Sequence, residues 1–160
     1  MNYDNIVLRR AQFILDEARS NDAVRDLAVV MTMRALSNYL TVGRDGSSWI
    51  VKKQNQFMSK EAHRLRAERT ANEWHKATTN EHQWELLKVW QTICERAETL
   101  SAADVCDLMK KYPFVTITNE ENIRLRDPIV KAATTPEERY SRAQIEIIQV
   151  ELSDSENLIE

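Results

Sequence analysis

The sequence predicts a mainly α-helical protein: a helical bundle with a small two-stranded β element near the C-terminus (α+β). Two observations lead to this prediction. Apolar residues recur at three- and four-residue spacing over most of the stretch from Asp4 to Tyr112. Two later segments instead alternate and are rich in β-branched residues, at 114–118 and 145–152.

The N-terminal part is expected to form two helices. The first runs from about Asp4, a plausible N-cap, to Arg19, and Ser20-Asn21-Asp22 then breaks the pattern and caps the next helix. The second runs from about Ala23 to Thr41 and is apolar over much of its circumference. Such a helix is typical of the centre of a bundle.

The middle of the chain is expected to be helical as well. Ser47-Ser48 can cap a long helix that reaches about Lys76, in which seven basic and three acidic residues give a net charge of +4. Thr78-Thr79-Asn80 is expected to end that segment and to cap a helix from about Glu81 to Thr99. A capping box at Ser101–Asp104 then starts a short helix that Pro113 terminates.

The C-terminal part contains both expected strands. Phe114–Thr118 is the first, and a capping box at Thr118–Glu121 starts a short helix after it. Thr135-Pro136 is a further helix start. The second strand, Ile145–Leu152, is a candidate to pair with the first. We therefore expect one helix-rich domain over residues 1–152, followed by a frayed tail at residues 153–160.

Composition excludes several classes of protein. The chain has 160 residues but only two glycines, Gly43 and Gly46, which lie in one loop. A Walker A loop, a dinucleotide-binding fingerprint and a nucleophile elbow all need glycines that are absent. No apolar run approaches the ~20 residues of a membrane-spanning helix, and no signal peptide is visible, so we expect a cytoplasmic protein without a membrane partner. Cys94 and Cys106 are expected to be free and partly buried.

The basic segment is the candidate binding surface. Its candidate residues are Lys52, Lys53, Lys60, Arg64, Arg69 and the neighbouring Trp74. Cations beside an aromatic ring suit a polyanion, either a nucleic acid or an acidic protein surface. The alternative is an ordinary solvated face, with the tryptophan in the core. Residues 136–160 are acidic instead, with seven acids and two bases.

Glu81-His82 is the candidate catalytic pair. The three histidines of the chain, His63, His75 and His82, all lie within twenty residues, together with several glutamates. A carboxylate next to an imidazole can hold a divalent metal, with His82 as metal ligand or general base. The alternative is that Glu81 favours the first turn of a helix and His82 is an ordinary, partly exposed residue.

One region resembles a group of uncharacterised bacterial proteins. It comprises Asn80-Glu81-His82, a spacer helix, Leu100-Ser101-Ala102-Ala103-Asp104-Val105, and Tyr112-Pro113 with the strand that ends Thr118-Asn119-Glu120-Glu121. Those proteins carry a Glu-His-x-x-Pro segment similar to the opening of HNH nucleases. The resemblance spans roughly Glu73 to Val150 and implies that Glu81 would hold a metal and His82 would act as the general base. Glu120 or Glu121 would supply a further carboxylate.

The sequence departs from this pattern at several positions. Glu85 stands where the proline is expected, Asn80 stands where a second histidine is usual, and no histidine follows His82. These departures favour a relative without nuclease activity. We therefore expect a non-enzymatic bacterial or phage binding protein that needs no cofactor. The alternatives are a metal-dependent HNH-like nuclease and a structural protein that self-associates as a homo-oligomer through Leu27–Leu40.

Overall fold

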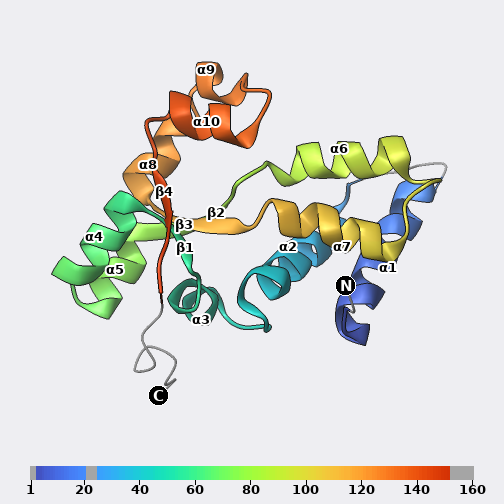
Figure 1. Ribbon diagram of the computed structural model, residues 1–160, viewed down its shortest axis with the longest axis horizontal. Coiled ribbons are helices and arrows are strands. Elements are labelled where there is room, and N and C mark those ends of the chain that lie inside the picture. The colour runs from blue at the N-terminus through green and yellow to red at the C-terminus, as the bar shows by residue number, and fades with distance from the viewer. Residues whose placement is uncertain (1–2, 21–24, 152–160) are drawn as a thin grey trace. The chain divides into compact units, whose positions relative to one another are not determined.

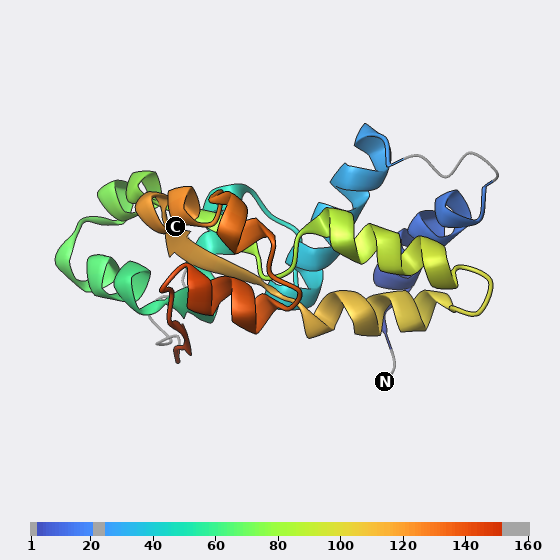
Figure 2. The same cartoon turned by 90° about the horizontal axis from the view of Figure 1, so that it is seen from above.

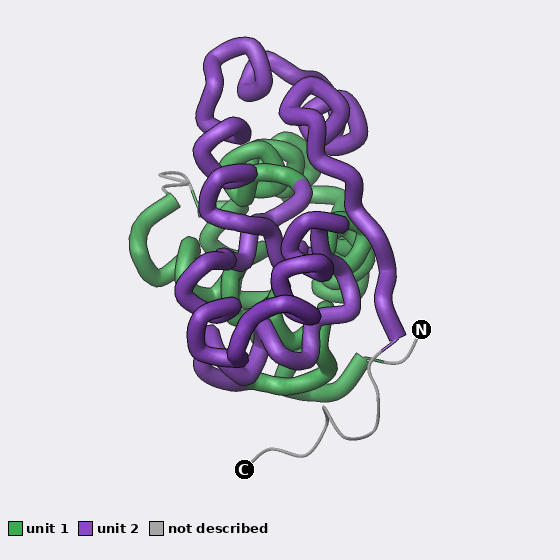
Figure 3. The backbone as a smooth tube through the Cα atoms, turned by 90° about the vertical axis from the view of Figure 1, so that its left-hand side faces the viewer, with its two compact units in different colours: residues 1–45, 84–113 green, residues 46–83, 114–160 purple. Residues whose placement is uncertain are grey.

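The computed structural model describes residues 3–20 and 25–151. Within them the chain forms two compact units, and each is built from two separate segments (Figure 3). Unit 1 comprises Met1–Asp45 and Trp84–Pro113, and unit 2 comprises Gly46–Gln83 and Phe114–Glu160. Over the described ranges, no helix is long and apolar enough to cross a membrane.

The regular secondary structure of unit 1, over its described residues, consists of helices (Figures 1 and 2). Its helices are α1 (Asn5–Arg19), α2 (Leu27–Val42), α6 (Leu86–Arg96) and α7 (Ala102–Lys111). All four contribute to one apolar core, which includes the fully buried Ile14, Met33, Leu36, Ile93 and Val105. The expected helical bundle is therefore present in this part of the chain.

Unit 2 contains a mixed four-stranded sheet (Figure 1). The strands are β1 (Phe57–Ser59), β2 (Thr78–His82), β3 (Phe114–Thr118) and β4 (Ile147–Gln149). Their order is β2-β3-β1-β4, with β1 parallel to β3 and the other two pairs antiparallel. The helices around it are α3 (Ser48–Lys53), α4 (Lys60–Glu68), α5 (Ala71–Ala77), α8 (Asn119–Arg124), α9 (Pro128–Lys131) and α10 (Pro136–Arg142).

The two faces of this sheet differ in character. Val115 and Ile117 of β3 point to one face and pack with Leu125, Val130 and Tyr140 from the α8–α10 segment. Thr116 points to the other face, because successive strand residues alternate. There its hydroxyl oxygen is bonded by the buried Asn55 side chain (3.1 Å). One face is thus an apolar core, and the other holds buried polar groups joined by hydrogen bonds.

The two-stranded β element expected from the sequence is smaller than the observed sheet. The strand at Phe114–Thr118 is confirmed, but the sheet has four strands rather than two. The expected second strand, Ile145–Leu152, is observed as Ile147–Gln149, and Leu152 lies outside the described residues. This strand pairs with β1, which separates it from β3. Short strands such as β1 carry too few residues for alternation to reveal them.

The long helix expected from Ser48 to Lys76 is also wrong. The segment is divided into α3, β1, α4 and α5. Ser59 caps α4, and a capping box of Thr70 and Glu73 starts α5. These side chains satisfy backbone N–H groups that a continuous helix would use internally, so each one begins a new helix.

The helix expected from Glu81 begins later, at Leu86. Thr78-Thr79-Asn80 does not cap a helix, because these residues form β2 and pair with β3 from Thr78–Thr118 to His82–Phe114. The β-branched Thr78 and Thr79 suit this pleated pairing. Glu81 and His82 consequently lie on a strand rather than on a helix.

Several expected local features are confirmed. Asp4, Ser47 and Thr135 are N-caps, and the capping boxes at Ser101–Asp104 and Thr118–Glu121 are both formed. Cys94 and Cys106 are free. The cap expected at Ser20-Asn21-Asp22 lies partly outside the described residues, and α2 is instead capped by Asp26. The tail at residues 153–160 also lies outside them.

Candidate functional site

The site is built where the two parallel strands of unit 2 end. Ser59 is the last residue of β1 and the N-cap of α4, and Thr118 is the last residue of β3 and the N-cap of α8. Because β1 and β3 are parallel, both strands direct their carboxyl ends to the same edge of the sheet. Open sheets with parallel strands commonly bind ligands at this edge.

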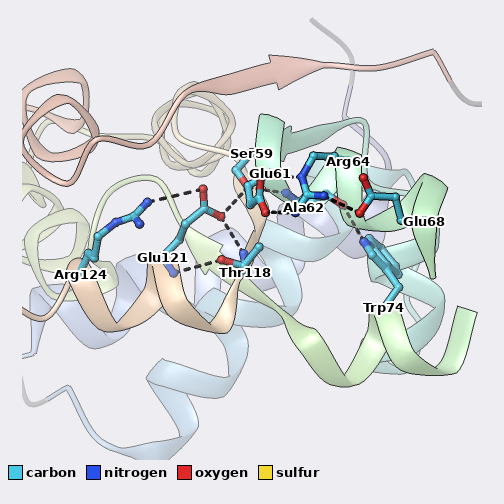
Figure 4. Close-up of polar contacts among 9 residues, drawn as sticks. All are labelled: Ser59, Glu61, Ala62, Arg64, Glu68, Trp74, Thr118, Glu121 and Arg124. Carbon is cyan, nitrogen blue, oxygen red and sulfur yellow. Dashed lines mark hydrogen bonds and ion pairs between the residues drawn. The ribbon is translucent and has the colours of Figure 1, made fainter. Parts of the chain in front are cut away.

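Glu121 joins the starts of the two helices (Figure 4). Its carboxylate accepts hydrogen bonds from the Ser59 hydroxyl (2.5 Å) and from the Thr118 backbone N–H (2.8 Å). Arg124 lies 3.8 Å from its other oxygen. Glu121 is only 4 % exposed, so its carboxyl group is buried and its polar atoms are satisfied by these hydrogen-bond donors. Its position makes it a structural link between α4 and α8.

Two adjoining recesses open beside this link. The first is about 330 Å³ and is lined by Arg64, Arg69 and Asn119 among others. The second is about 430 Å³, and Lys60 and Arg124 contribute to its wall. Both recesses share the residues Glu61, Thr118 and Glu120. Cationic side chains from α4, its C-cap and α8 are thereby brought together around one edge of the sheet.

Acidic residues match these cations in number, because Glu61, Glu120, Glu121 and Glu146 also line the two recesses. Arg64 is bonded to both Glu61 and Glu68, which raises the pKa of its guanidinium and lowers that of Glu61. Lys60 lies 3.3 Å from Glu146, with both side chains well exposed. Exposed ion pairs of this kind contribute at most about 1 kcal/mol, so an incoming anion can replace the glutamates. Arg69 forms no ion pair with another described residue.

Lys52 and Trp74, two residues of the expected binding surface, are buried instead. The Lys52 amine donates to the carbonyl oxygens of His75 (3.0 Å) and Thr78 (2.7 Å), and burial lowers its pKa to about 8. The Trp74 indole N–H donates to the carbonyl oxygen of Ala62 (2.9 Å). Both side chains therefore hold α3, α4, α5 and β2 together.

Lys53 is half-buried and lies apart from the recesses. Its amine is 5.2 Å from the centre of the Trp49 ring, a distance at which the cation and the ring attract. Trp49 also contacts His75 edge-on, with ring centres 4.7 Å apart. Burial lowers the pKa of His75, so its imidazole is neutral at pH 7. Of the residues of the expected binding surface, Lys60, Arg64 and Arg69 are the ones that line the recesses.

Glu81 and His82 point to opposite faces of the sheet. Glu81 pairs with Val115, whose side chain lies in the apolar core, and His82 pairs with Phe114 on the other face. Glu81 is engaged in an ion pair with the buried Arg139 of α10, at 2.7 Å. A carboxylate and an imidazole arranged in this way do not converge on one metal ion.

The described ranges contain no group of three or more histidine, cysteine, aspartate or glutamate side chains arranged to hold a metal. Glu120 and Glu121, the further carboxylates that the resemblance suggested, adjoin the recesses rather than His82. Arg139 was not expected from the sequence. A single arginine in a short amphipathic helix gives no sign that it will be buried.

The contact between Ser59 and Glu121 likewise has no signal in the local sequence. The capping box that contains Glu121 was visible in the sequence, but the contact with Ser59 joins residues 62 positions apart. Only the pairing of β1 with β3 brings them together. Comparisons of the chain with protein-family models, with curated proteins and with solved structures found no match in any of the three.

Proposed function

We propose that this chain is a non-enzymatic binding protein whose unit 2 engages a phosphate-bearing polyanion, with a nucleic acid as the foremost candidate. The observation that carries the proposal is the gathering of Lys60, Arg64, Arg69 and Arg124 around two adjoining recesses. Arginine suits this role because its planar guanidinium binds two phosphate oxygens at once.

The recesses provide shape as well as charge. Asn119 lines the first recess beside Arg64 and Arg69, and its amide offers a further polar contact to a backbone phosphate or sugar. No contact to bases is implied, and the net charge of −3 for the whole chain argues against strong binding outside this local surface. Weak, salt-sensitive binding is therefore the expectation.

Fluorescence anisotropy with labelled single-stranded and double-stranded DNA, in the presence of a chelator, tests the proposal. Binding should weaken steeply with salt. Replacing both Arg64 and Arg69 with alanine should weaken it further and reduce the slope of log affinity against log salt by about two. Measurement at two or more salt concentrations in the same buffer gives this slope directly.

A matched control removes two exposed arginines from unit 1, Arg9 and Arg34, and so changes the net charge by the same amount. If this control loses as much binding as the Arg64/Arg69 variant, the effect is one of total charge and the recesses are not the site. Binding of poly-glutamate in place of DNA would identify an acidic protein as the class of partner.

Self-association is a second candidate, supported by α2. Leu27 is 75 % exposed and Met31 is 54 % exposed. They lie one turn apart, so they share a face of the helix, and Ala28 and Arg34 are the other exposed residues of α2. A solvent-facing surface with a single charge is unusual for a helix and often marks an interface.

Light scattering during gel filtration tests this second candidate. The chain has a mass of 18.7 kDa, and self-association through α2 should give a multiple of it that does not depend on salt. The double variant Leu27→Asp, Met31→Asp should run as a monomer. Ile129→Asp, at an apolar residue of unit 2 that is 71 % exposed, should leave the mass unchanged. A wild-type mass of one chain at high protein concentration would contradict the idea.

A further inference from the structure

β4 lies at one end of the four-stranded sheet, so one of its sides has no partner strand among the described residues. Its other side pairs with β1. The Lys60 N–H donates to the Glu146 carbonyl (2.9 Å), and the Val150 N–H donates to the Gln56 carbonyl (2.8 Å). In an antiparallel pair, alternate residues turn their backbone groups toward the partner. The backbone N–H and C=O groups of Ile147 and Gln149 therefore point to the open side of β4.

A recess of about 390 Å³ adjoins this strand. Ile147 belongs to both the strand and the recess, and its side chain packs with the apolar core on the α8–α10 face. Other apolar surface comes from Pro136, Tyr140 and Ile145. Among the residues that line the recess, Glu137 carries the only charge. An apolar floor with one carboxylate suits a side chain that has an aliphatic stem and a cationic end.

The surface around this recess is negatively charged, as Glu137 is. Glu137 and Glu151 are exposed, and neither forms an ion pair with another described residue. The two arginines of α10 are already engaged, Arg139 with Glu81 and Arg142 with Glu138. Among the described acids of this part of the chain, Glu138 and Glu146 are thus ion-paired, whereas Glu137 and Glu151 leave uncompensated negative charge near β4.

We propose that the open side of β4 binds an extended segment of another protein in which lysine or arginine alternates with apolar residues. The segment adds a strand to the sheet by bonding the backbone groups of Ile147 and Gln149. Every second side chain then lies over the face that carries the recess, where a basic side chain meets Glu137. This surface shares no lining residue with the two recesses beside Glu121. Because its charge is negative, it recognises a basic partner rather than a polyanion.

A fluorescein-labelled heptapeptide in which lysine alternates with valine is the probe, and anisotropy with the full-length protein is the measurement. The peptide should bind with a Kd in the micromolar range or weaker, as expected for so short a strand. The same peptide with glutamate in place of lysine should not bind. Failure of the lysine peptide to bind at millimolar concentration, or equal binding of both peptides, would overturn the proposal.

Two variants test the two parts of the contact. Gln149→Pro removes an outward-facing N–H that the sheet itself does not use, so it should keep the fold and weaken the peptide at least about tenfold. Gln149→Ala is its control and should bind within about twofold of wild type. Glu137→Gln, which leaves the backbone untouched, should weaken the peptide about two- to fivefold. Unchanged affinity in both Gln149→Pro and Glu137→Gln would exclude this edge as the binding site.

Discussion

Two adjacent lysines show how differently neighbouring residues of one helix are used. Lys52 is 3 % exposed, whereas Lys53 is only half-buried. Successive helical residues point about 100° apart, so one of the two enters the interior of unit 2. There the Lys52 amine donates to the carbonyl of His75, in the last turn of α5, and to that of Thr78, which is the C-cap of the same helix. A cation at the end of a helix is favourable in this position.

Because the Lys52 amine is buried, we expect the stability of the protein to depend on pH. Burial lowers the pKa of Lys52 from 10.5 to about 8 in the folded protein, while the unfolded chain keeps the ordinary value. Between these two values the unfolded state holds one more proton, so this residue adds stability as the pH rises. Its contribution is complete above pH 10.5 and is lost as the pH falls through 8.

Urea unfolding of wild type and Lys52→Met at pH 7.5 and pH 10 measures this contribution. The free energy of unfolding of wild type, relative to the variant, should rise by about 2 kcal/mol over this interval. Lys53→Met is the control and should follow wild type. Parallel pH profiles for wild type and Lys52→Met would show that the amine is not buried as described.

Among the secondary-structure elements, α4 and α8 depend on each other. Each begins directly after a strand, with its own N-cap, and Glu121 bonds to both caps. The carboxylate satisfies two buried donors at once. A short helix such as α8 has little stability of its own, so its start depends on this contact.

Removing the Glu121 carboxylate should therefore be costly. Glu121→Ala leaves the Ser59 hydroxyl and the Thr118 N–H without their acceptor, and we expect a loss of about 2–3 kcal/mol in the free energy of unfolding. Glu120→Ala, at the exposed neighbouring position of the same turn, should change it by less than about 0.5 kcal/mol. Urea unfolding followed by circular dichroism gives both values. Equal losses in the two variants would argue against a buried link.

The whole molecule consists of two units that interleave along the chain. In the sequence, the two segments of unit 1 flank the first segment of unit 2. Each unit has its own apolar core. Separate cores predict that the units open separately, because local unfolding follows the packing contacts. A cut in the chain at a unit boundary would not release a complete unit 1.

Hydrogen exchange can detect this independence. Ile93→Ala in unit 1 and Ile117→Ala in unit 2 each remove a fully buried side chain, at a cost of about 2–5 kcal/mol. Each variant should accelerate exchange mainly in its own unit. If either substitution accelerates exchange equally in both units, the two cores unfold as one.

The sequence by itself determined the features that depend on neighbouring residues. Asp4, Ser47, Ser101, Thr118 and Thr135 were recognisable as helix starts, because an N-cap needs only a short polar side chain and the next three residues. The strand at Phe114–Thr118 was recognisable from its β-branched alternation. The helical bundle of unit 1 followed from apolar periodicity.

Tertiary structure alone decided the size of the sheet and the composition of the site. Strand β1 is three residues long and exists only because β3 and β4 offer it backbone partners. The strand expected at Ile145–Leu152 is reduced to the three residues of β4, which pair with β1. The pairing of β2 with β3 turns Glu81 and His82 to opposite faces, and the pairing of β1 with β3 brings Ser59 to Glu121. Burial of Lys52 and Trp74 likewise depends on elements packed around them. Such contacts join residues far apart in sequence, and local patterns carry no information about them.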